Sequence, residues 1–298
     1  MSVVEYAGRP ADCVAAKAAG SGLSQTDFNR LADFVHKTIG ISLASSKRIM
    51  VESRLRKRLE EMSMPSFRAY CDYVLGPAGE SEIAPLLDRI TTNKTDFFRE
   101  PAHFGFLTTT VLPAMRNLCQ SGIRQPLSVW SAGCSTGEEP WTLAMVLGDY
   151  AGAQPGGRFR FAITATDIST RVLEKARAGI YDAVHAEPIP HTMRRRFLLR
   201  SKDNGPPLVR ICPELRPTVQ FHRLNLMDAD FGFDSPFDTI FCRNVMIYFN
   251  RAVQEQLVNR FASNLKPGGY LFVGHSESLN GLDTRLVAVA PSIYRKPS

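Results

Sequence analysis

The stretch LSVWSAGCSTGEEP, residues 127–140, begins as a short apolar strand and passes through a glycine-rich turn into a helix. Small residues at 131–137 let a ligand approach the backbone closely, and Gly133 and Gly137 can adopt a positive φ. The pattern therefore predicts a strand–turn–helix unit with room for a ligand at the turn. The alternative interpretation is a tight turn that serves the fold alone.

Two carboxylates, Glu138 and Glu139, open the helix of this unit. A pyrophosphate commonly binds at such a helix start, and these two side chains would repel it. A ligand with a cationic end would be favoured instead. S-adenosylmethionine carries an α-ammonium and a sulfonium and no phosphate, so the pair favours this methyl donor over a nicotinamide dinucleotide. The pattern does not decide which glutamate contacts the donor.

Outward from this unit, strands and helices alternate to the end of the chain. The alternation predicts an α/β fold with a doubly wound, mostly parallel, Rossmann-like sheet and helices on both faces. The expected strands are 127–131, 159–166, 219–222, 237–242 and 270–273, the last after a Pro-Gly-Gly turn at 267–269. The expected helices are 138–150, one capped by Ser169, and 251–265, and segments 286–289 and 292–294 suggest an edge hairpin.

The rest of the chain divides into four further parts. Residues 1–22, rich in Ala, Gly and Ser, predict a flexible tail, and residues 23–92 an all-helical N-terminal domain. Residues 93–126 would form a linker and the first helix of the domain at 127–298. Residues 183–218 are rich in Pro and Arg and predict a small inserted antiparallel β-subdomain, with strands near 197–200 and 208–211.

Local signals mark the ends of the helical domain's first two helices. Ser24 or Thr26 can cap the first helix, and Gly40 can end it. Ser45 or Ser46 is expected to cap a second helix that runs to about residue 62.

Two more segments lie at expected carboxyl ends of strands, where ligands bind in such sheets. Asp167 ends the second strand, and an acid at that place commonly accepts hydrogen bonds from ribose hydroxyls. Alternatively it caps the following helix. Asn225 and Leu226 follow the third strand, where they could meet the adenine edge and face, although the segment alone is only a loop.

Five motifs occur in order along the chain: TTNKTDFFRE at 91–100, WSAGCSTGEEP at 130–140, ATDI at 165–168, FCRNVMIYF at 241–249 and GHSE at 274–277. Together they resemble the chemotaxis receptor glutamate O-methyltransferases, the CheR family, over about residues 25–295. The resemblance implies a class I S-adenosylmethionine-dependent methyltransferase domain behind the helical domain. It also implies transfer of a methyl group to glutamate carboxylates of chemotaxis receptors, which leaves S-adenosylhomocysteine as the product.

The resemblance also assigns site residues. The implied donor-binding residues are Asn93, Thr95, Arg99, Glu139 (with Glu138 as its rival), Asp167, Asn225, Leu226, Arg243 and Asn244. Arg99 and Tyr248 would flank the transferring methyl as the catalytic pair. A glutamate carboxylate, with a pKa of about 4.3, is already the nucleophile at neutral pH, so no general base is needed. Arg99 could bind it with two parallel hydrogen bonds, and Tyr248 could orient it.

The net charge of +7 favours an anionic partner. Lys47, Arg54 and Arg58 are spaced to form one basic edge of the second helix, which is either a solvated face or, as the resemblance favours, a dock for acidic receptor helices. The inserted β-subdomain is a second candidate, for a receptor C-terminal peptide. Its expected loop at 202–207 has a single glycine, Gly205, and two prolines. This composition argues against an open binding loop.

Some classes of protein are disfavoured. The six cysteines form no C-x-x-C motif and no Cys/His zinc spacing, so we expect reduced thiols and no metal. No signal peptide and no apolar run of about 18 residues is present, so we expect a cytoplasmic protein, recruited to membrane-bound receptor arrays as the resemblance implies. GHSES lacks the second glycine of a hydrolase elbow.

Two alternatives remain besides receptor methylation. The first is a methyltransferase of the same fold acting on nucleic acid or a small molecule, which the RNVMIY segment opposes; we expect no nucleic-acid partner. The second is a non-catalytic, donor-binding signalling adaptor.

Overall fold

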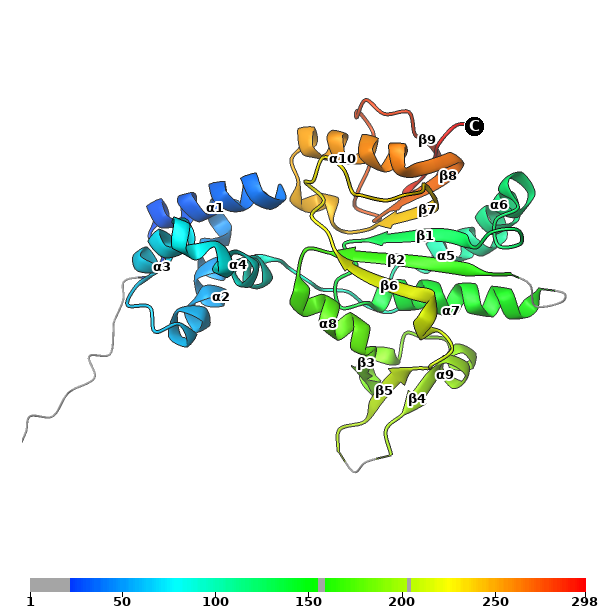
Figure 1. The fold of residues 1–298 in the computed structure, drawn as a ribbon, viewed down its shortest axis with the longest axis horizontal. Coiled ribbons are helices and arrows are strands. Elements are labelled where there is room, and N and C mark those ends of the chain that lie inside the picture. The colour runs from blue at the N-terminus through cyan, green and yellow to red at the C-terminus, as the bar shows by residue number, and fades with distance from the viewer. Residues whose placement is uncertain (1–21, 155–158, 203–204) are drawn as a thin grey trace, which may run out of the picture.

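The computed structural model describes residues 22–154, 159–202 and 205–298, so the expected tail and parts of the loops at 151–158 and 202–207 lie outside it. Figure 1 shows a helical domain at one end, a central sheet covered by helices, and a small β-subdomain below it. The helical domain contains α1 (Gln25–Ile39), α2 (Arg48–Glu61), α3 (Phe67–Val74) and α4 (Ile83–Ile90). Their apolar faces pack into one buried core that includes Phe28, Leu55 and Tyr70.

The helix ends in this domain follow the expected capping chemistry only in part. The Ser24 hydroxyl accepts the backbone N–H of Asp27 at the start of α1, and Gly40 ends α1 in the left-handed conformation. The prediction of a serine cap on α2 is wrong. Ser45 and Ser46 lie within a 3-10 turn, and α2 continues from it because Arg48 donates its N–H to the carbonyl of Ser45.

The central sheet has seven strands in the order β6-β2-β1-β7-β8-β10-β9. Their bounds are β1 (Leu127–Ala132), β2 (Phe161–Asp167), β6 (Val219–Arg223), β7 (Phe237–Cys242), β8 (Leu265–Val273), β9 (Val287–Ala290) and β10 (Ile293–Arg295). The first five in the spatial order are parallel, and β10 runs antiparallel to β8. The order reverses between β1 and β7, where such sheets bind ligands. The predicted fold class and edge hairpin are confirmed.

Helices cover both faces of the sheet, as Figure 1 shows. They are α5 (Ala102–Phe106), a π-helical turn Leu107–Val111, α6 (Leu112–Cys119), α7 (Glu138–Ala153), α8 (Thr170–Ala178) and α10 (Arg251–Asn264). One buried cluster contains Trp141 and Phe272, and the other contains Trp130 and Phe261. The predicted turn at 267–269 is wrong: these residues lie within β8, and an irregularity in the β7–β8 register accommodates them.

The inserted subdomain is a three-stranded antiparallel sheet in the order β3-β5-β4. It contains β3 (Ile180–Asp182), α9 (His191–Phe197), β4 (Leu198–Arg200) and β5 (Leu208–Ile211). The two predicted strands are confirmed. The sequence analysis did not anticipate β3, which is only three residues long and precedes residue 183, or the short helix α9.

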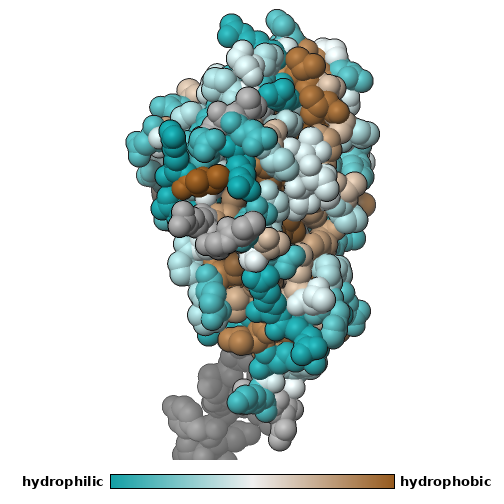
Figure 2. Space-filling model, turned by 90° about the vertical axis from the view of Figure 1, so that its right-hand side faces the viewer, coloured by the Kyte–Doolittle hydropathy of each residue, from teal (hydrophilic) through white to brown (hydrophobic). Residues whose placement is uncertain are grey.

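The molecule's far face, opposite the helical domain, mixes hydrophilic and hydrophobic side chains (Figure 2). The edge strand β9 carries two of the exposed large apolar residues, Val287 and Val289. Within the described part of the chain, no helix is long and apolar enough to cross a membrane. The described cysteines Cys71, Cys134, Cys212 and Cys242 are buried free thiols.

Candidate active site

A pocket lies between the helical domain and the carboxyl ends of β1, β2, β6 and β7. Its open space is about 1230 Å³ including the mouth, which is ample for a nucleoside-sized ligand. The residues predicted from the sequence all line it: Asn93, Thr95, Arg99, Glu139, Asp167, Asn225, Leu226, Arg243, Asn244 and Tyr248. The fold therefore brings together residues from five separate segments of the chain.

The linker at 91–99 forms one wall of the pocket and is held by contacts on both sides. The buried Phe97 ring packs edge-on against Tyr181, with ring centroids 4.9 Å apart. The backbone N–H of Phe98 donates to the Thr142 hydroxyl at 3.2 Å. The Ser135 hydroxyl donates to the carbonyl of Asn93 at 2.9 Å. These contacts fix the path of the linker across the pocket.

The helical domain closes another side of the pocket, which the sequence analysis did not foresee. Ser42 donates its backbone N–H to the carbonyl of Tyr248 at 2.9 Å. The Asn225 amide donates to the carbonyl of Thr38 at 2.7 Å, and Asn225 Oδ1 accepts the N–H of Met227 at 3.1 Å. Side chains from this domain therefore also line the pocket: Ile39, Ile41, Leu43, Lys47 and Met50.

Asp167 ends β2 and is buried. Its carboxylate accepts the backbone N–H groups of Ser135 at 2.8 Å and Ser169 at 3.0 Å. Burial raises the pKa of Asp167, and these hydrogen bonds oppose that rise. A carboxylate has about four lone-pair sites, so two remain for a ligand. The cap of α8 is Ser169, as predicted, because its hydroxyl accepts the backbone N–H of Val172 at 3.3 Å. The alternative that Asp167 caps this helix is wrong: Asp167 holds the turn before it.

The two glutamates at the start of α7 differ in position. Glu139 lines the pocket, where its carboxylate accepts the Ser131 hydroxyl at 2.7 Å and Arg243 Nη1 at 3.2 Å. Glu138 is buried beside the pocket and accepts the Thr136 hydroxyl at 2.6 Å. The geometry thus favours Glu139 as the residue that faces a ligand. Burial raises the pKa of Glu139, and Arg243 opposes the shift.

Arg243 is buried and already engaged on all sides. It contacts Glu139, it lies 3.0 Å from Glu100 Oε2 through Nη2, and it donates to the backbone carbonyl of Arg99. Although burial raises the pKa of Glu100, Arg243 holds it below its ordinary value. Glu100 was part of a quoted motif without an assigned role. Its partner Arg243 is distant in sequence, so no local pattern could indicate the pairing.

Glu277 organises the loop after β7. It is buried, and its carboxylate accepts the backbone N–H groups of Asn244 at 2.8 Å, Ile247 at 3.2 Å and Gly274. Asn244 has a φ of 60°, a conformation that costs a non-glycine residue free energy. The carboxylate compensates for this cost and positions the segment that leads to Tyr248. In the sequence, Glu277 is part of the GHSE motif, which does not indicate this role.

Arg99 and Tyr248, the predicted catalytic pair, are less constrained. The Arg99 guanidinium donates one long hydrogen bond, 3.4 Å, to the carbonyl of Lys94. It forms no ion pair with any carboxylate in residues 22–154, 159–202 and 205–298. Tyr248 is half-buried, and its backbone is held by Ser42 and Val245. An arginine without an acidic partner in a pocket is available to bind an anion.

The three cations of the expected basic edge differ in their contacts. Arg58 binds the buried Glu82 through Nε and Nη2, at 2.8 and 2.6 Å. Arg54 donates to the carbonyls of Ile90 and Thr91 at 2.7 and 3.1 Å, where α4 leads into the linker. Arg54 and Arg58 therefore stabilise the helical domain. Of the three predicted cations, only Lys47, in the turn before α2, is exposed and lines the pocket.

Comparison with known proteins gives one consistent family. The profile described as "CheR methyltransferase, SAM binding domain" matches residues 93–294, and "CheR methyltransferase, all-alpha domain" matches residues 26–91. The chain is 38% identical to a chemotaxis protein methyltransferase of Borreliella burgdorferi, over 92% of this chain and 95% of that protein. It is 39% identical to the one of Escherichia coli, over 91% of each. A third, chemotaxis protein methyltransferase 2 of Pseudomonas aeruginosa, is 37% identical over 91% of this chain and 93% of that protein.

Proposed function

Because this chain belongs to the CheR methyltransferase family and is an S-adenosylmethionine-dependent methyltransferase, we propose that it methylates glutamate side chains of chemotaxis receptors. The product would be a glutamate methyl ester. The observation that carries the choice of a carboxylate acceptor is Arg99, a guanidinium that lines the pocket without an acidic partner in the described chain. An acceptor carboxylate would supply that partner.

The buried carboxylates fit the donor. Asp167 keeps two free lone-pair sites, enough for the two ribose hydroxyls. Glu139 would face the methionine ammonium, and a cation there would offset the cost of burying this carboxylate. Leu226 supplies an apolar wall for the adenine. Arg243 would act mainly through Glu139, because four of its five N–H donors are already engaged.

The remaining predicted contacts follow from the walls of the pocket. Asn93 and Thr95 would close over the donor from the linker, together with Arg99. Asn225 would approach the adenine with whichever of its amide hydrogens Thr38 leaves free. Asn244 would lie near the methionine end, held there by Glu277.

For this reaction the protein has to align the two reacting groups and exclude water from them. The methyl donor supplies the electrophilic carbon when bound. The acceptor carboxylate is ionised at neutral pH, with a pKa of about 4.3 in the unperturbed side chain, so no group of the chain has to remove a proton. Arg99 would hold the carboxylate in line with the methyl group, and the Tyr248 hydroxyl would orient it. The helical domain and linker would exclude water from the reacting groups.

The same proposal covers the partners. Acidic receptor helices would meet the pocket mouth beside Lys47, and Arg54 and Arg58 would support that face by holding α2 against α4. We expect Lys47→Glu to weaken receptor binding and the matched change Lys57→Glu, at an exposed position of α2, to leave it unchanged. A receptor C-terminal peptide at the inserted β-subdomain, and recruitment to receptor arrays, are further parts of the proposal.

The test is methyl transfer from tritium-labelled donor to cytoplasmic receptor fragments. We expect label that alkali releases as methanol, which is diagnostic of a carboxylate ester. RNA and a receptor fragment with its acidic side chains replaced serve as parallel acceptors. Label that resists alkali, or label in RNA and none in the receptor, would refute the proposed acceptor.

A further inference from the structure

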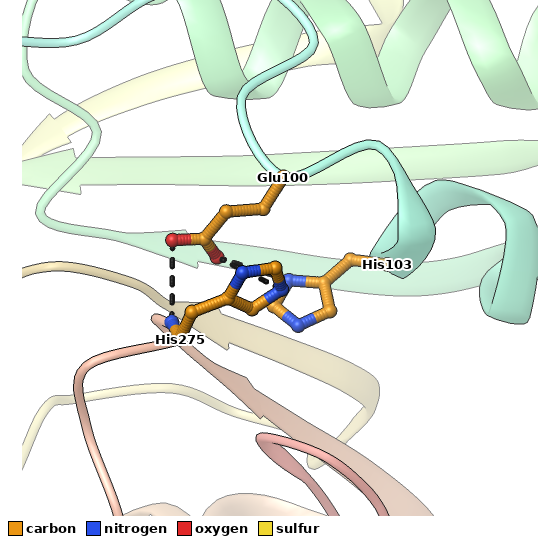
Figure 3. A group of neighbouring side chains, drawn as sticks. All are labelled: Glu100, His103 and His275. Atoms are coloured by element: carbon orange, nitrogen blue, oxygen red, sulfur yellow. Dashed lines mark hydrogen bonds and ion pairs between the residues drawn. The ribbon is translucent and has the colours of Figure 1, made fainter.

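Three metal-ligand side chains lie together behind the pocket, outside the residues assigned to donor or acceptor. They are Glu100 at the end of the linker, His103 of α5 and His275 after β8 (Figure 3). His103 Nδ1 lies 3.4 Å and His275 Nε2 lies 4.0 Å from the same oxygen, Glu100 Oε2. One ligand atom from each of the three residues lies within 4.8 Å of the other two.

A second observation, on His103, points to a ligand at this place. The residue is 1% exposed, and within the described part of the chain neither ring nitrogen makes a hydrogen bond; Nδ1 has only the 3.4 Å contact with Glu100 Oε2. Buried polar groups are nearly always paired, because an unpaired one costs about 1–3 kcal/mol. Figure 3 shows the ring directed toward Glu100 and His275.

The donor set selects the class of ligand. Two imidazoles and one carboxylate are typical of Zn²⁺ sites with an open fourth position, whereas Mg²⁺ and Ca²⁺ prefer oxygen ligands alone. In a tetrahedral zinc site with bonds of about 2.0–2.1 Å, neighbouring ligand atoms are roughly 3.3 Å apart. The 3.4 Å separation already agrees with this spacing. The His275 side chain is 53% exposed, so it can close the 4.0 Å separation, and its exposure gives an ion a path from solvent.

We propose that Glu100, His103 and His275 form a binding site for a Zn²⁺-like transition metal ion, with water as the fourth ligand. The sequence predicts no metal, because no closely spaced Cys and His residues mark a site. Here the ligands come from two ends of the methyltransferase domain, and only the fold joins them.

Occupation of this site would affect the donor pocket. Glu100 Oε2, the oxygen nearest both histidines, is also the oxygen that Arg243 contacts at 3.0 Å. A cation at the site would compete with Arg243 for it, and Arg243 in turn contacts Glu139 at 3.2 Å. Arg243 displaced from Glu100 would pair more closely with Glu139, the carboxylate proposed to face the donor. We therefore infer that the metal ion lowers affinity for the donor. This part of the inference rests on the proposed function, whereas the metal site itself does not.

The experiment is calorimetric titration of the full chain, freed of metal by a chelator, with Zn²⁺ alone. We expect one site in the wild type, and its affinity for Zn²⁺ should fall at least about tenfold in His275→Ala. His275 is chosen because its exposure spares the fold. His185→Ala is the matched control, since this exposed histidine also faces a carboxylate, Asp182 at 3.6 Å. Equal Zn²⁺ affinity in wild type and His275→Ala, or Mg²⁺ binding as tight as Zn²⁺, would overturn the site.

A second titration, with S-adenosylhomocysteine, tests the coupling. Zn²⁺ should weaken this binding in the wild type and leave it unchanged in His275→Ala. Product affinity that is insensitive to Zn²⁺ in the wild type would overturn the coupling. The two failures are distinguishable: a chain that binds Zn²⁺ and no S-adenosylhomocysteine contradicts the proposed function, and a chain that binds S-adenosylhomocysteine and no Zn²⁺ contradicts the metal site.

Discussion

The sheet wall and the linker wall of the pocket use their polar side chains in different ways. On the sheet wall, Asp167, Glu139 and Arg243 are each fixed by two or more hydrogen bonds to other parts of the protein. On the linker wall, Arg99 has one long hydrogen bond to a backbone carbonyl. The sheet wall is thus organised before a ligand arrives, and the linker wall presents a group that still lacks its partner.

This difference indicates a division of labour. A preorganised wall binds a ligand at little further cost in conformational entropy, which suits the proposed donor, a molecule of fixed structure. An arginine without a carboxylate partner can bind the carboxylate of an incoming acceptor. Its interaction accelerates the reaction only if it is stronger in the transition state than in the ground state. The predictions below test this division, from the largest expected effect to the smallest.

The largest effect should come from the linker wall. We expect Arg99→Ala to lower kcat by about 10²–10³-fold, the range seen when one transition-state donor is removed. Donor affinity should change far less, because the sheet wall remains intact. Steady-state kinetics with a receptor fragment and a separate product-binding titration would measure the two quantities. Arg99→Lys keeps the positive charge but cannot donate two parallel hydrogen bonds, so its activity should remain close to that of Arg99→Ala. Wild-type turnover in Arg99→Ala would remove this residue from the site.

A change on the sheet wall should lower donor affinity more than it lowers kcat. Asp167→Asn keeps the shape of the side chain but removes the charge, and a hydrogen bond to a charged group contributes about 1.5–3 kcal/mol. We therefore expect affinity for S-adenosylhomocysteine to fall by about 10–100-fold, with a smaller loss of kcat at saturating donor. Asp149→Asn is the control, because that carboxylate pairs with Arg196 at the surface. Unchanged affinity in Asp167→Asn would contradict the assignment of Asp167 to the donor.

A third prediction concerns the loop after β7, which leads to Tyr248. Glu277→Ala would leave the backbone N–H groups of Asn244, Ile247 and Gly274 without their acceptor. We expect the free energy of unfolding to fall by about 1–3 kcal/mol and kcat to fall with it, as the loop that carries Tyr248 loses its support. Denaturant unfolding would measure the first. Glu255→Ala, which removes one surface acceptor for Asp283, should lie near the wild type.

The smallest effect is a pH dependence of donor affinity. Burial raises the pKa of Glu139, so this carboxylate becomes protonated at a higher pH than an exposed glutamate. The donor ammonium favours the ionised form. Donor affinity should therefore be constant at high pH, fall as the pH decreases through this raised pKa, and level off once Glu139 is protonated, with a total loss smaller than that expected for Asp167→Asn. Binding of S-adenosylhomocysteine measured from pH 8 to pH 5 tests this, and Glu139→Gln should flatten the curve.

The part of the site that could be predicted from sequence is the part formed by local patterns. The strand–turn–helix unit predicted a pair of carboxylates, Glu138 and Glu139, at the pocket, and the end of β2 predicted Asp167, because these positions depend on neighbours in the chain. The choice between Glu138 and Glu139 needed the structure, since it depends on which side chain faces the pocket.

What could not be predicted depends on contacts between distant segments. Glu100 with Arg243, Glu277 with Asn244, and Arg58 with Glu82 join elements whose separation in sequence carries no period or motif. Helical spacing alone placed Arg54 and Arg58 on one edge of α2, but it could not show that neighbouring helices use those side chains. Likewise β3 is too short to produce an alternating pattern.

The most direct test of the central claim is a crystal structure with S-adenosylhomocysteine bound. The account predicts ribose hydroxyls at Asp167, the methionine amine at Glu139 and the sulfur directed toward Arg99 and Tyr248. A nucleoside bound away from Asp167, or a sulfur directed away from Arg99, would contradict it.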